Sequence, residues 1–401
     1  MSAPWLSLVG IGEDGLDGLS SAARERLGQA RLIVGGARHL GLLGATTAET
    51  LAWASPLTDT IPRILAHRGS PVAVLASGDP FHYGIGTTLL AHVPAGEIEA
   101  LPTLSAFALA ANRLHWAQQT TVTLSLHGRA LERIVPHLQP GARILALSWD
   151  GTTPEALARL LTARGLGKSH LTVCEAMGGP RERIRSSEAA TFDLDAIDPL
   201  NTVALEVVAE TARCLPLTPG LRDDWFEHDG QITRREVRAV TLSALAPRCG
   251  ERLIDIGSGS GSIAIEWMLT CAENEAVAIE PRPDRAARIV RNAKALGVPD
   301  LRIVEGKAPE MLEGLSAADA IFIGGGATAP GMLDRVLDRL KPQGRLVANA
   351  VTLETQSLLL DWRKQCGGDL VEIAVSEAET IGGFTGWKPA RPIVQWRWEK
   401  R

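Results

Sequence analysis

The sequence predicts an α/β protein of two domains, because apolar strands alternate with helical patterns and this alternation starts twice along the chain. The chain has 401 residues, of which 45% are hydrophobic and 22% charged, an ordinary composition for a globular protein of more than one domain. A glycine-rich turn, DIGSGSG at residues 255–261, opens the second alternation. Its late position is explained if it begins a second domain.

The first domain is expected to contain a mostly parallel sheet, since its apolar segments are separated by helical ones. The sequence predicts buried strands at residues 5–10, 31–36, 71–78, 121–126, 142–148 and 201–208. It predicts helices between them at residues 20–30, 86–93, 105–114 and 154–165.

A segment without periodicity separates the two alternations. Residues 213–231 hold two prolines, two glycines and a cluster of acids, which indicates a linker between a first domain at 1–212 and a second at 232–401. A helix is expected at 232–245, with Thr233 as its N-cap. Five strands should follow, and the period-two segments DLVEIAVSEAE and ARPIVQWRWEK predict an antiparallel pair at one edge of a Rossmann-like sheet.

Charge and cysteine content exclude several classes of protein. The net charge is −5, so no basic excess points to nucleic acid or to an anionic membrane. The opening MSAPWLSLVGIGEDG is expected to be a strand and a loop rather than a signal peptide, and no apolar run would span a membrane. Widely spaced cysteines predict free thiols in a reducing cytoplasm and no metal site; they are Cys174, Cys214, Cys249, Cys271 and Cys366.

The glycine turn has the pattern expected for binding a nucleotide-like cofactor. A strand, a glycine turn and a helix start present free backbone N–H groups to a ligand, and glycine permits the close approach. The predicted cofactor residues here are Asp255, Gly257, Ser258, Gly259, Ser260, Gly261 and Glu280. Glu280 ends the next strand, where an acid accepts hydrogen bonds from ribose hydroxyls.

The spacing GxGxG and the acid before it favour S-adenosylmethionine over a dinucleotide. The dinucleotide fingerprint is GxGxxG, and a pyrophosphate would be repelled by Asp255, whereas a methionyl ammonium group would be attracted. A turn that binds no ligand remains the structural alternative.

The second domain resembles the class I S-adenosylmethionine-dependent methyltransferases, and within them the decarboxylating precorrin methyltransferases of cobalamin biosynthesis. The resemblance covers about residues 228–401 and rests on ITRREVRAV, LIDIGSGSGSIAIEW, AIEPRPDRAARIVRNAKALGV, IVEGKAPE, FIGGG and RLVANAVTLET. It implies that Thr233, the glycine turn, Glu280 and Ala308 contact the cofactor. Lys307 departs from the pattern, because a small or acidic residue is expected there.

The first domain resembles the class III tetrapyrrole methyltransferases, in the branch that acts on precorrin-6Y. The resemblance covers about residues 3–210 and rests on VGIGEDGLDGLS, GGARHL, SGDPFHYG, PTLSA and SLHGR. It implies a second cofactor site lined by Ser77, Gly78, Asp79, His82, Ser105 and Ala106. The wider family has a Gly-Pro-Gly-Asp loop where this chain has Glu13, Asp14 and Gly15, so Asp14 is a candidate for proton transfer or a turn residue that bonds its own backbone.

Together the two resemblances imply a two-domain enzyme with two S-adenosylmethionine sites per chain. The implied reaction methylates precorrin-6Y at ring positions 5 and 15 and removes the ring C acetate carboxyl, giving precorrin-8X. The first domain would methylate position 5, and the second would methylate position 15 and decarboxylate. The resemblance also implies a homo-oligomer.

A polycarboxylate substrate requires local positive charge on a net-negative protein. The candidates in the motif loops and on the helix before the glycine turn are Arg38, His39, His127, Arg129 and Arg234, with Arg235 and Arg238 on the same helix. Glu266 follows the glycine turn and could lie near the reacting ring as a catalytic acid, or on the helix surface.

Three other functions compete with this interpretation. A nucleic-acid methyltransferase is opposed by the absence of a basic stripe, and binding of RNA or DNA at low salt would test it. An NAD-dependent dehydrogenase is opposed by the glycine spacing, and a nicotinamide titration would test it. A non-enzymatic module would bind S-adenosylmethionine without turnover.

Overall fold

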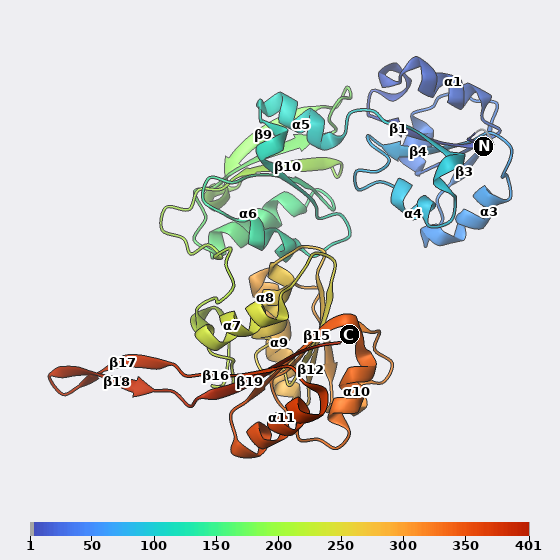
Figure 1. Cartoon of the computed structure of the whole chain (residues 1–401). Coiled ribbons are helices and arrows are strands. Elements are labelled where there is room, and N and C mark those ends of the chain that lie inside the picture. The colour runs from blue at the N-terminus through green and yellow to red at the C-terminus, as the bar shows by residue number, and fades with distance from the viewer. Residues whose placement is uncertain (1–3, 401) are drawn as a thin grey trace. The chain divides into compact units, whose positions relative to one another are not determined.

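The computed structural model describes residues 4–400, so the first three residues of the expected first domain and Arg401 of the second lie outside the described residues. The chain forms two compact units (Figure 1). Unit 1 comprises Met1–Leu131 and His137–Cys214, and unit 2 comprises Glu132–Pro136 and Leu215–Arg401.

The first sheet of unit 1 is entirely parallel and has the order β3-β2-β4-β1-β5. Its strands are β1 (Leu6–Ile11), β2 (Leu32–Gly35), β3 (Glu49–Ala52), β4 (Val72–Ser77) and β5 (Ile98–Leu101). The connecting helices are α1 (Ser21–Gln29), α2 (Ala37–Gly41), α3 (Ile61–Leu65) and α4 (Gly86–Leu90). Apolar clusters cover both faces of the central strands, as a buried parallel sheet requires.

The second sheet of unit 1 has the order β6-β7-β10-β8-β9 and is mostly antiparallel, which corrects the expectation of a parallel sheet here. Only β6 (Thr121–Ser125) and β7 (Arg143–Leu147) pair in parallel, while β8 (His170–Glu175), β9 (Arg183–Glu188) and β10 (Asn201–Glu206) pair antiparallel. The connection from β8 to β9 is too short for a crossover helix, so these strands must run in opposite directions. The helices of this part are α5 (Ala106–Leu114) and α6 (Thr153–Ala163).

Unit 2 contains one seven-stranded sheet of order β13-β12-β11-β14-β15-β19-β16. The parallel strands are β11 (Arg252–Ile256), β12 (Glu275–Glu280), β13 (Arg302–Glu305), β14 (Ala318–Ile323) and β15 (Leu340–Ala350). The predicted antiparallel edge is confirmed, because β19 (Ile393–Glu399) pairs antiparallel with both β15 and β16 (Asp369–Ile373). The helices are α7 (Arg235–Leu245), α8 (Ser262–Leu269), α9 (Pro283–Leu296), α10 (Met332–Arg339) and α11 (Leu353–Cys366).

A separate hairpin extends away from the seven-stranded sheet of unit 2 (Figure 1). It consists of β17 (Ser376–Ile381) and β18 (Phe384–Pro389), which pair only with each other. Three large apolar side chains on it are exposed, namely Ile381, Phe384 and Trp387. The period-two pattern of the sequence does not distinguish this hairpin from the edge strands.

From Leu215 onward, the segment expected as a linker is part of unit 2. Leu221 and Phe226 are buried, and the backbone N–H of Glu227 donates to the amide oxygen of Asn292 at 2.8 Å. The predicted N-cap at Thr233 is wrong by one residue: α7 begins at Arg235, with Arg234 at the N-cap position. The Thr233 carbonyl instead accepts a hydrogen bond from the Arg238 guanidinium.

The expectation of free thiols is wrong for one pair of cysteines. Cys249 and Cys271 form a disulfide, because the loop before β11 and the loop after α8 lie together although the cysteines are 22 residues apart. Cys174, Cys214 and Cys366 are free. Among the described helices, none has both the length and the apolar character needed to cross a membrane.

Candidate functional site

The glycine turn of unit 2 lies at the carboxyl end of β11, where ligands bind in open α/β sheets. Gly257 has φ 72°, and a Cβ there would lie 2.9 Å from the backbone nitrogen of Gly325 in the FIGGG turn. Gly261 has φ 77°, and a Cβ would lie 2.7 Å from the Ile289 side chain. Both positions therefore require glycine for conformation and for space.

Asp255 is a buried residue near the carboxyl end of β11, and one of its carboxylate oxygens has no partner among the described residues. Its Oδ2 accepts the N–H of Ala264 at 3.3 Å, while Oδ1 is buried and makes no hydrogen bond to the described residues. Burial raises the pKa of this carboxyl group to about 7, opposed in part by the hydrogen bond from Ala264. A cation placed against Oδ1 would satisfy it, so the site fits the ammonium group of S-adenosylmethionine.

Glu280 ends β12 beside the turn and is nearly fully buried. Its Oε2 accepts the N–H of Gly259 at 2.8 Å, and its Oε1 accepts the N–H of Arg282 at 3.1 Å. The carboxylate thus holds the turn in place from the next strand. The hydroxyl of Ser258 donates to the Asp255 carbonyl at 2.8 Å, while the buried hydroxyl of Ser260 has no described partner.

The remaining predicted cofactor residues of unit 2 follow neighbouring elements. Ala308 lies after β13, half-buried and packed against the apolar cluster of the sheet, while Lys307 is exposed. Thr233 is half-buried, and the carbonyl of nearby Gln231 would lie 3.2 Å from a Cβ at Gly259. The structure therefore brings the segment before α7 against the glycine turn.

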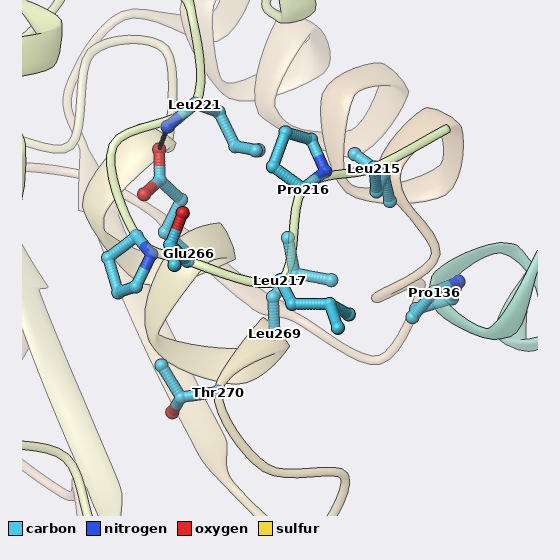
Figure 2. A pocket seen from close by; sticks show the side chains of 10 residues that line it. Pro136, Leu215, Pro216, Leu217, Leu221, Glu266, Leu269 and Thr270 are labelled. Carbon is cyan, nitrogen blue, oxygen red and sulfur yellow. Dashed lines mark hydrogen bonds between the residues drawn. The ribbon is translucent and has the colours of Figure 1, made fainter. Parts of the chain in front are cut away.

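Glu266 has a structural environment that the sequence did not reveal. It is 2% exposed, and its Oε1 accepts a hydrogen bond from Nε of the fully buried Arg238 at 2.6 Å. The backbone N–H groups of Gly220 and Leu221 donate to the same carboxylate at 2.6 and 3.1 Å, and Figure 2 shows the bond to Leu221. Both oxygens are occupied and the side chain is buried, so the alternative of an acid on the helix surface is wrong, while the catalytic role of Glu266 stays a prediction.

Arg238 is likewise committed to the protein interior. Besides Glu266, its guanidinium contacts Asp223 at 3.2 Å and donates to the carbonyls of Thr233 and Leu221. It is therefore not available for a substrate carboxylate. Arg234 is exposed and pairs with Asp223 at 3.2 Å, and Arg235 donates to the carbonyl of Gly220.

In unit 1, the two predicted walls of the cofactor site meet. Gly78 follows β4 with φ 60°, and a Cβ there would lie 2.7 Å from the Cα of Ser105. The Ser105 hydroxyl accepts the N–H of Ala108 at 3.2 Å and so caps α5, in which Ala106 is the first residue. Asp79 Oδ1 accepts the N–H of Phe81 at 2.8 Å, which closes the turn after the strand.

A polar network joins three strand ends of the first sheet. Arg38 pairs with Glu13 and donates to the Ser77 hydroxyl at 2.8 Å, and its Nη2 lies 2.7 Å from Nε2 of His39. Burial and the Arg38 charge lower the pKa of His39 to about 4, so this ring is neutral. Since arginine only donates, Nε2 of His39 is the acceptor.

Glu13, rather than Asp14, is the acid that gathers partners in this loop. Glu13 contacts both Arg38 and Arg181, the latter at 3.2 Å, while Asp14 is exposed and its carbonyl accepts the N–H of Asp17 at 3.3 Å. The sequence already pointed to Glu13, because it is the first residue at which this chain departs from the Gly-Pro-Gly-Asp loop of the family. The catalytic role of Asp14 stays a prediction.

The other predicted substrate residues of unit 1 lie in the loop after β6. His127 and Arg129 are exposed, and the Arg129 guanidinium carbon lies 5.5 Å from the ring centroid of Tyr83. The His82 ring stacks on Tyr83 at 5.3 Å and packs against Phe107 at 4.8 Å.

Comparisons with known proteins match the two parts of the chain to two different families. The family described as Tetrapyrrole (Corrin/Porphyrin) Methylases matches residues 6–193, and the Precorrin methyltransferase domain matches residues 224–400. A precorrin-6Y C(5,15)-methyltransferase [decarboxylating] of Sinorhizobium sp is 53% identical over 400 residues, covering 99% of this chain and 97% of the relative. The chain belongs to this family.

Further relatives carry the same name. The enzyme of Mycobacterium tuberculosis (strain ATCC 25618 / H37Rv) is 40% identical over 401 residues, covering 98% of this chain and 99% of the relative. The crystal structure of the C-terminal domain of precorrin-6Y C5,15-methyltransferase from Rhodobacter capsulatus is 44% identical and covers 46% of this chain and all of that domain, with a TM-score of 0.44. The protein is thus a decarboxylating, S-adenosylmethionine-dependent methyltransferase of cobalamin biosynthesis.

Proposed function

We propose that this enzyme methylates precorrin-6Y at ring positions 5 and 15 and decarboxylates the ring C acetate, giving precorrin-8X, with one S-adenosylmethionine site in each unit. Unit 1 would methylate position 5, and unit 2 would methylate position 15 and decarboxylate. One observation carries the proposal: in each unit, a turn at the end of a strand requires glycine. A Cβ at Gly78 of unit 1 would clash with Ser105, and a Cβ at Gly257 of unit 2 would clash with Gly325. The relatives' names supply the substrate.

In unit 2, the residues present suit the methyl donor. The free Oδ1 of Asp255 would bind the ammonium group, and Glu280 would lie beside the ribose at the end of β12. S-adenosylmethionine, when bound, supplies an electrophilic methyl group. The glycine turn allows the backbone to approach it closely, which excludes water from that side.

In unit 1, Ser77, Gly78, Asp79 and His82 would form one side of the cofactor site, and Ser105 and Ala106 the other. Position is the main demand on both units, since a meso carbon of a reduced tetrapyrrole is enamine-like and already nucleophilic. Holding it in line with a methyl group can lower the barrier by about 7–11 kcal/mol in favourable systems. No catalytic triad is therefore required.

The substrate carboxylates require cations near each site. We propose Arg38 and Arg129 as the cations of unit 1 and Arg234 as the cation of unit 2, with His127 and the uncharged His39 as further polar residues of the substrate site in unit 1. The acetate that is lost must instead be left poorly solvated and weakly paired, so that its electrons can move into the electron-poor ring system.

We also propose that the enzyme is a homo-oligomer, with the β17–β18 hairpin as a contact. An isolated two-stranded hairpin is marginally stable in water, and this one exposes Ile381, Phe384 and Trp387. Light scattering of the double variant Phe384→Ser/Trp387→Ser should show a smaller species than the wild type. An unchanged mass would remove the hairpin from the interface.

The binding stoichiometry of S-adenosylhomocysteine, measured by calorimetry on the full chain, tests the two-site proposal. We expect two sites, one lost in Gly78→Asp and the other lost in Gly259→Asp. Gly28→Asp and Gly383→Asp are matched controls, since a Cβ at either glycine meets nothing within 4 Å. A single site, lost only in Gly259→Asp, would contradict methylation by unit 1.

A further inference from the structure

Tyr83 is the only tyrosine of the chain, and its backbone is unusual. It lies in the SGDPFHYG loop after β4 with φ 56°, in the left-handed region. Residues other than glycine occupy this region rarely, and they persist there when the surrounding structure holds them.

Three contacts hold Tyr83 across unit 1. Its hydroxyl donates to the carbonyl of Thr123 on β6 at 3.3 Å. Its ring lies 5.3 Å from the His82 ring in a stacked arrangement and 5.9 Å from the tilted Phe107 ring on α5. A residue from a loop between two strands of the first sheet, β4 and β5, is thus attached to elements of the second sheet.

Arg129 lies over the Tyr83 ring and has no charged partner among the described residues. Its guanidinium carbon is 5.5 Å from the ring centroid, and within residues 4–400 this guanidinium makes no ion pair or hydrogen bond. Arg38 and Arg183 of unit 1 differ, because Arg38 pairs with Glu13 and Arg183 with Glu175. An arginine stacked on an aromatic face keeps its N–H groups in the guanidinium plane free to bind a carboxylate in a bidentate manner.

We propose that Tyr83 is a positioning residue that holds Arg129 on its ring, so that Arg129 grips a carboxylate of the tetrapyrrole in unit 1. The inference rests on the proposed function of unit 1 and identifies one residue pair that selects a polycarboxylate. Tyr83 is 46% exposed, so the pair is accessible to such a ligand. The left-handed backbone at Tyr83 is explained, because it directs the ring toward β6 and the loop that follows it.

Uroporphyrin, a polycarboxylated porphyrin, serves as the probe with the full chain. Its dissociation constant, measured by absorbance titration, should rise about tenfold or more in Arg129→Ala, since a charged hydrogen bond is lost. It should rise about two- to fivefold in Tyr83→Leu, which removes the ring face, and change little in Tyr83→Phe, which keeps it. Arg31→Ala is the matched control, because Arg31 is an exposed arginine on another part of unit 1.

The double variant Tyr83→Leu/Arg129→Ala separates positioning from a merely structural role. If Tyr83 acts through Arg129, the double variant should bind no more weakly than Arg129→Ala alone. Additive losses, or an Arg129→Ala variant that binds like Arg31→Ala, would overturn the proposal.

The single tyrosine also reports directly on unit 1. Protein labelled with 3-fluorotyrosine should give one ¹⁹F resonance, which we expect to shift when uroporphyrin is added and not in the Arg129→Ala variant. A resonance that uroporphyrin leaves unmoved would overturn the assignment of the pair. Calorimetry with S-adenosylhomocysteine separates the two failures: a missing unit 1 site refutes the proposed function, whereas an intact site with unchanged porphyrin binding refutes only the role of Tyr83.

Discussion

Replacing Glu266 by glutamine distinguishes a structural anchor from a catalytic acid. The substitution keeps the shape of the side chain but leaves the charge of Arg238 without its closest partner in the interior, where Arg238 is 0% exposed. Removing one partner of a buried ion pair typically costs about 3–5 kcal/mol. Asp223 still lies 3.2 Å from Arg238, so we expect a loss at the lower end, about 3 kcal/mol.

Differential scanning calorimetry of the full chain measures this loss. A change of 1 kcal/mol shifts the melting temperature of a domain of this size by about 2–4 °C, so the transition of unit 2 should fall by about 6–12 °C. Glu275→Gln is the matched control, because Glu275 is mostly exposed and its 2.6 Å ion pair with Arg252 is expected to contribute less than about 1 kcal/mol.

The activity of the folded variant decides the interpretation. Below its melting temperature, Glu266→Gln should bind S-adenosylhomocysteine and decarboxylate at a rate within a few-fold of the wild type. A variant that melts like Glu275→Gln but no longer decarboxylates would refute the structural reasoning and restore Glu266 as a catalytic acid.

Three further predictions concern unit 2. Burial raises the pKa of Asp255 to about 7, above its unfolded value of about 4, so the unliganded unit should lose stability as pH rises between these values. Calorimetry at several pH values should show that the melting temperature of Asp255→Asn depends less steeply on pH than that of the wild type. Reducing the Cys249–Cys271 disulfide, with its separation of 22 residues, should lower the free energy of unfolding by about 3 kcal/mol in urea titrations, and Cys271→Ser should be insensitive to the reductant. Gly257→Ala should lower the free energy of unfolding by at least about 1–3 kcal/mol in the same titration, because Gly257 has φ 72° and a Cβ there would clash with the FIGGG backbone. Gly383→Ala is the control, since a Cβ at that position meets open space.

The glycine turn and its strand could be predicted because both signals are local. The apolar run before Asp255 specifies a buried strand, and the alternating glycines specify positive φ at Gly257, Gly259 and Gly261. By contrast, β3 and β9 escaped prediction, since most of their side chains are exposed and their sequences lack an apolar alternation.

Contacts between residues that are distant in the sequence could not be predicted. Glu266 and Arg238 are 28 residues apart and meet because α7 and α8 pack together, which no local pattern encodes. The disulfide has the same origin, as does the polar network in which Glu13 meets Arg181. For Asp14, the position in a motif was visible in the sequence, whereas the exposure of its side chain was not.

The order of strands in unit 2 also constrains how the protein is made. β19 lies between β15 and β16, although the ribosome synthesises it after both. Gln395 on β19 is fully buried and donates to the Thr241 hydroxyl at 3.0 Å and to the Asn349 amide oxygen at 2.9 Å. Until β19 emerges, β15 and β16 expose unpaired edges that invite aggregation, so a nascent chain of this enzyme is vulnerable until its final strand is inserted.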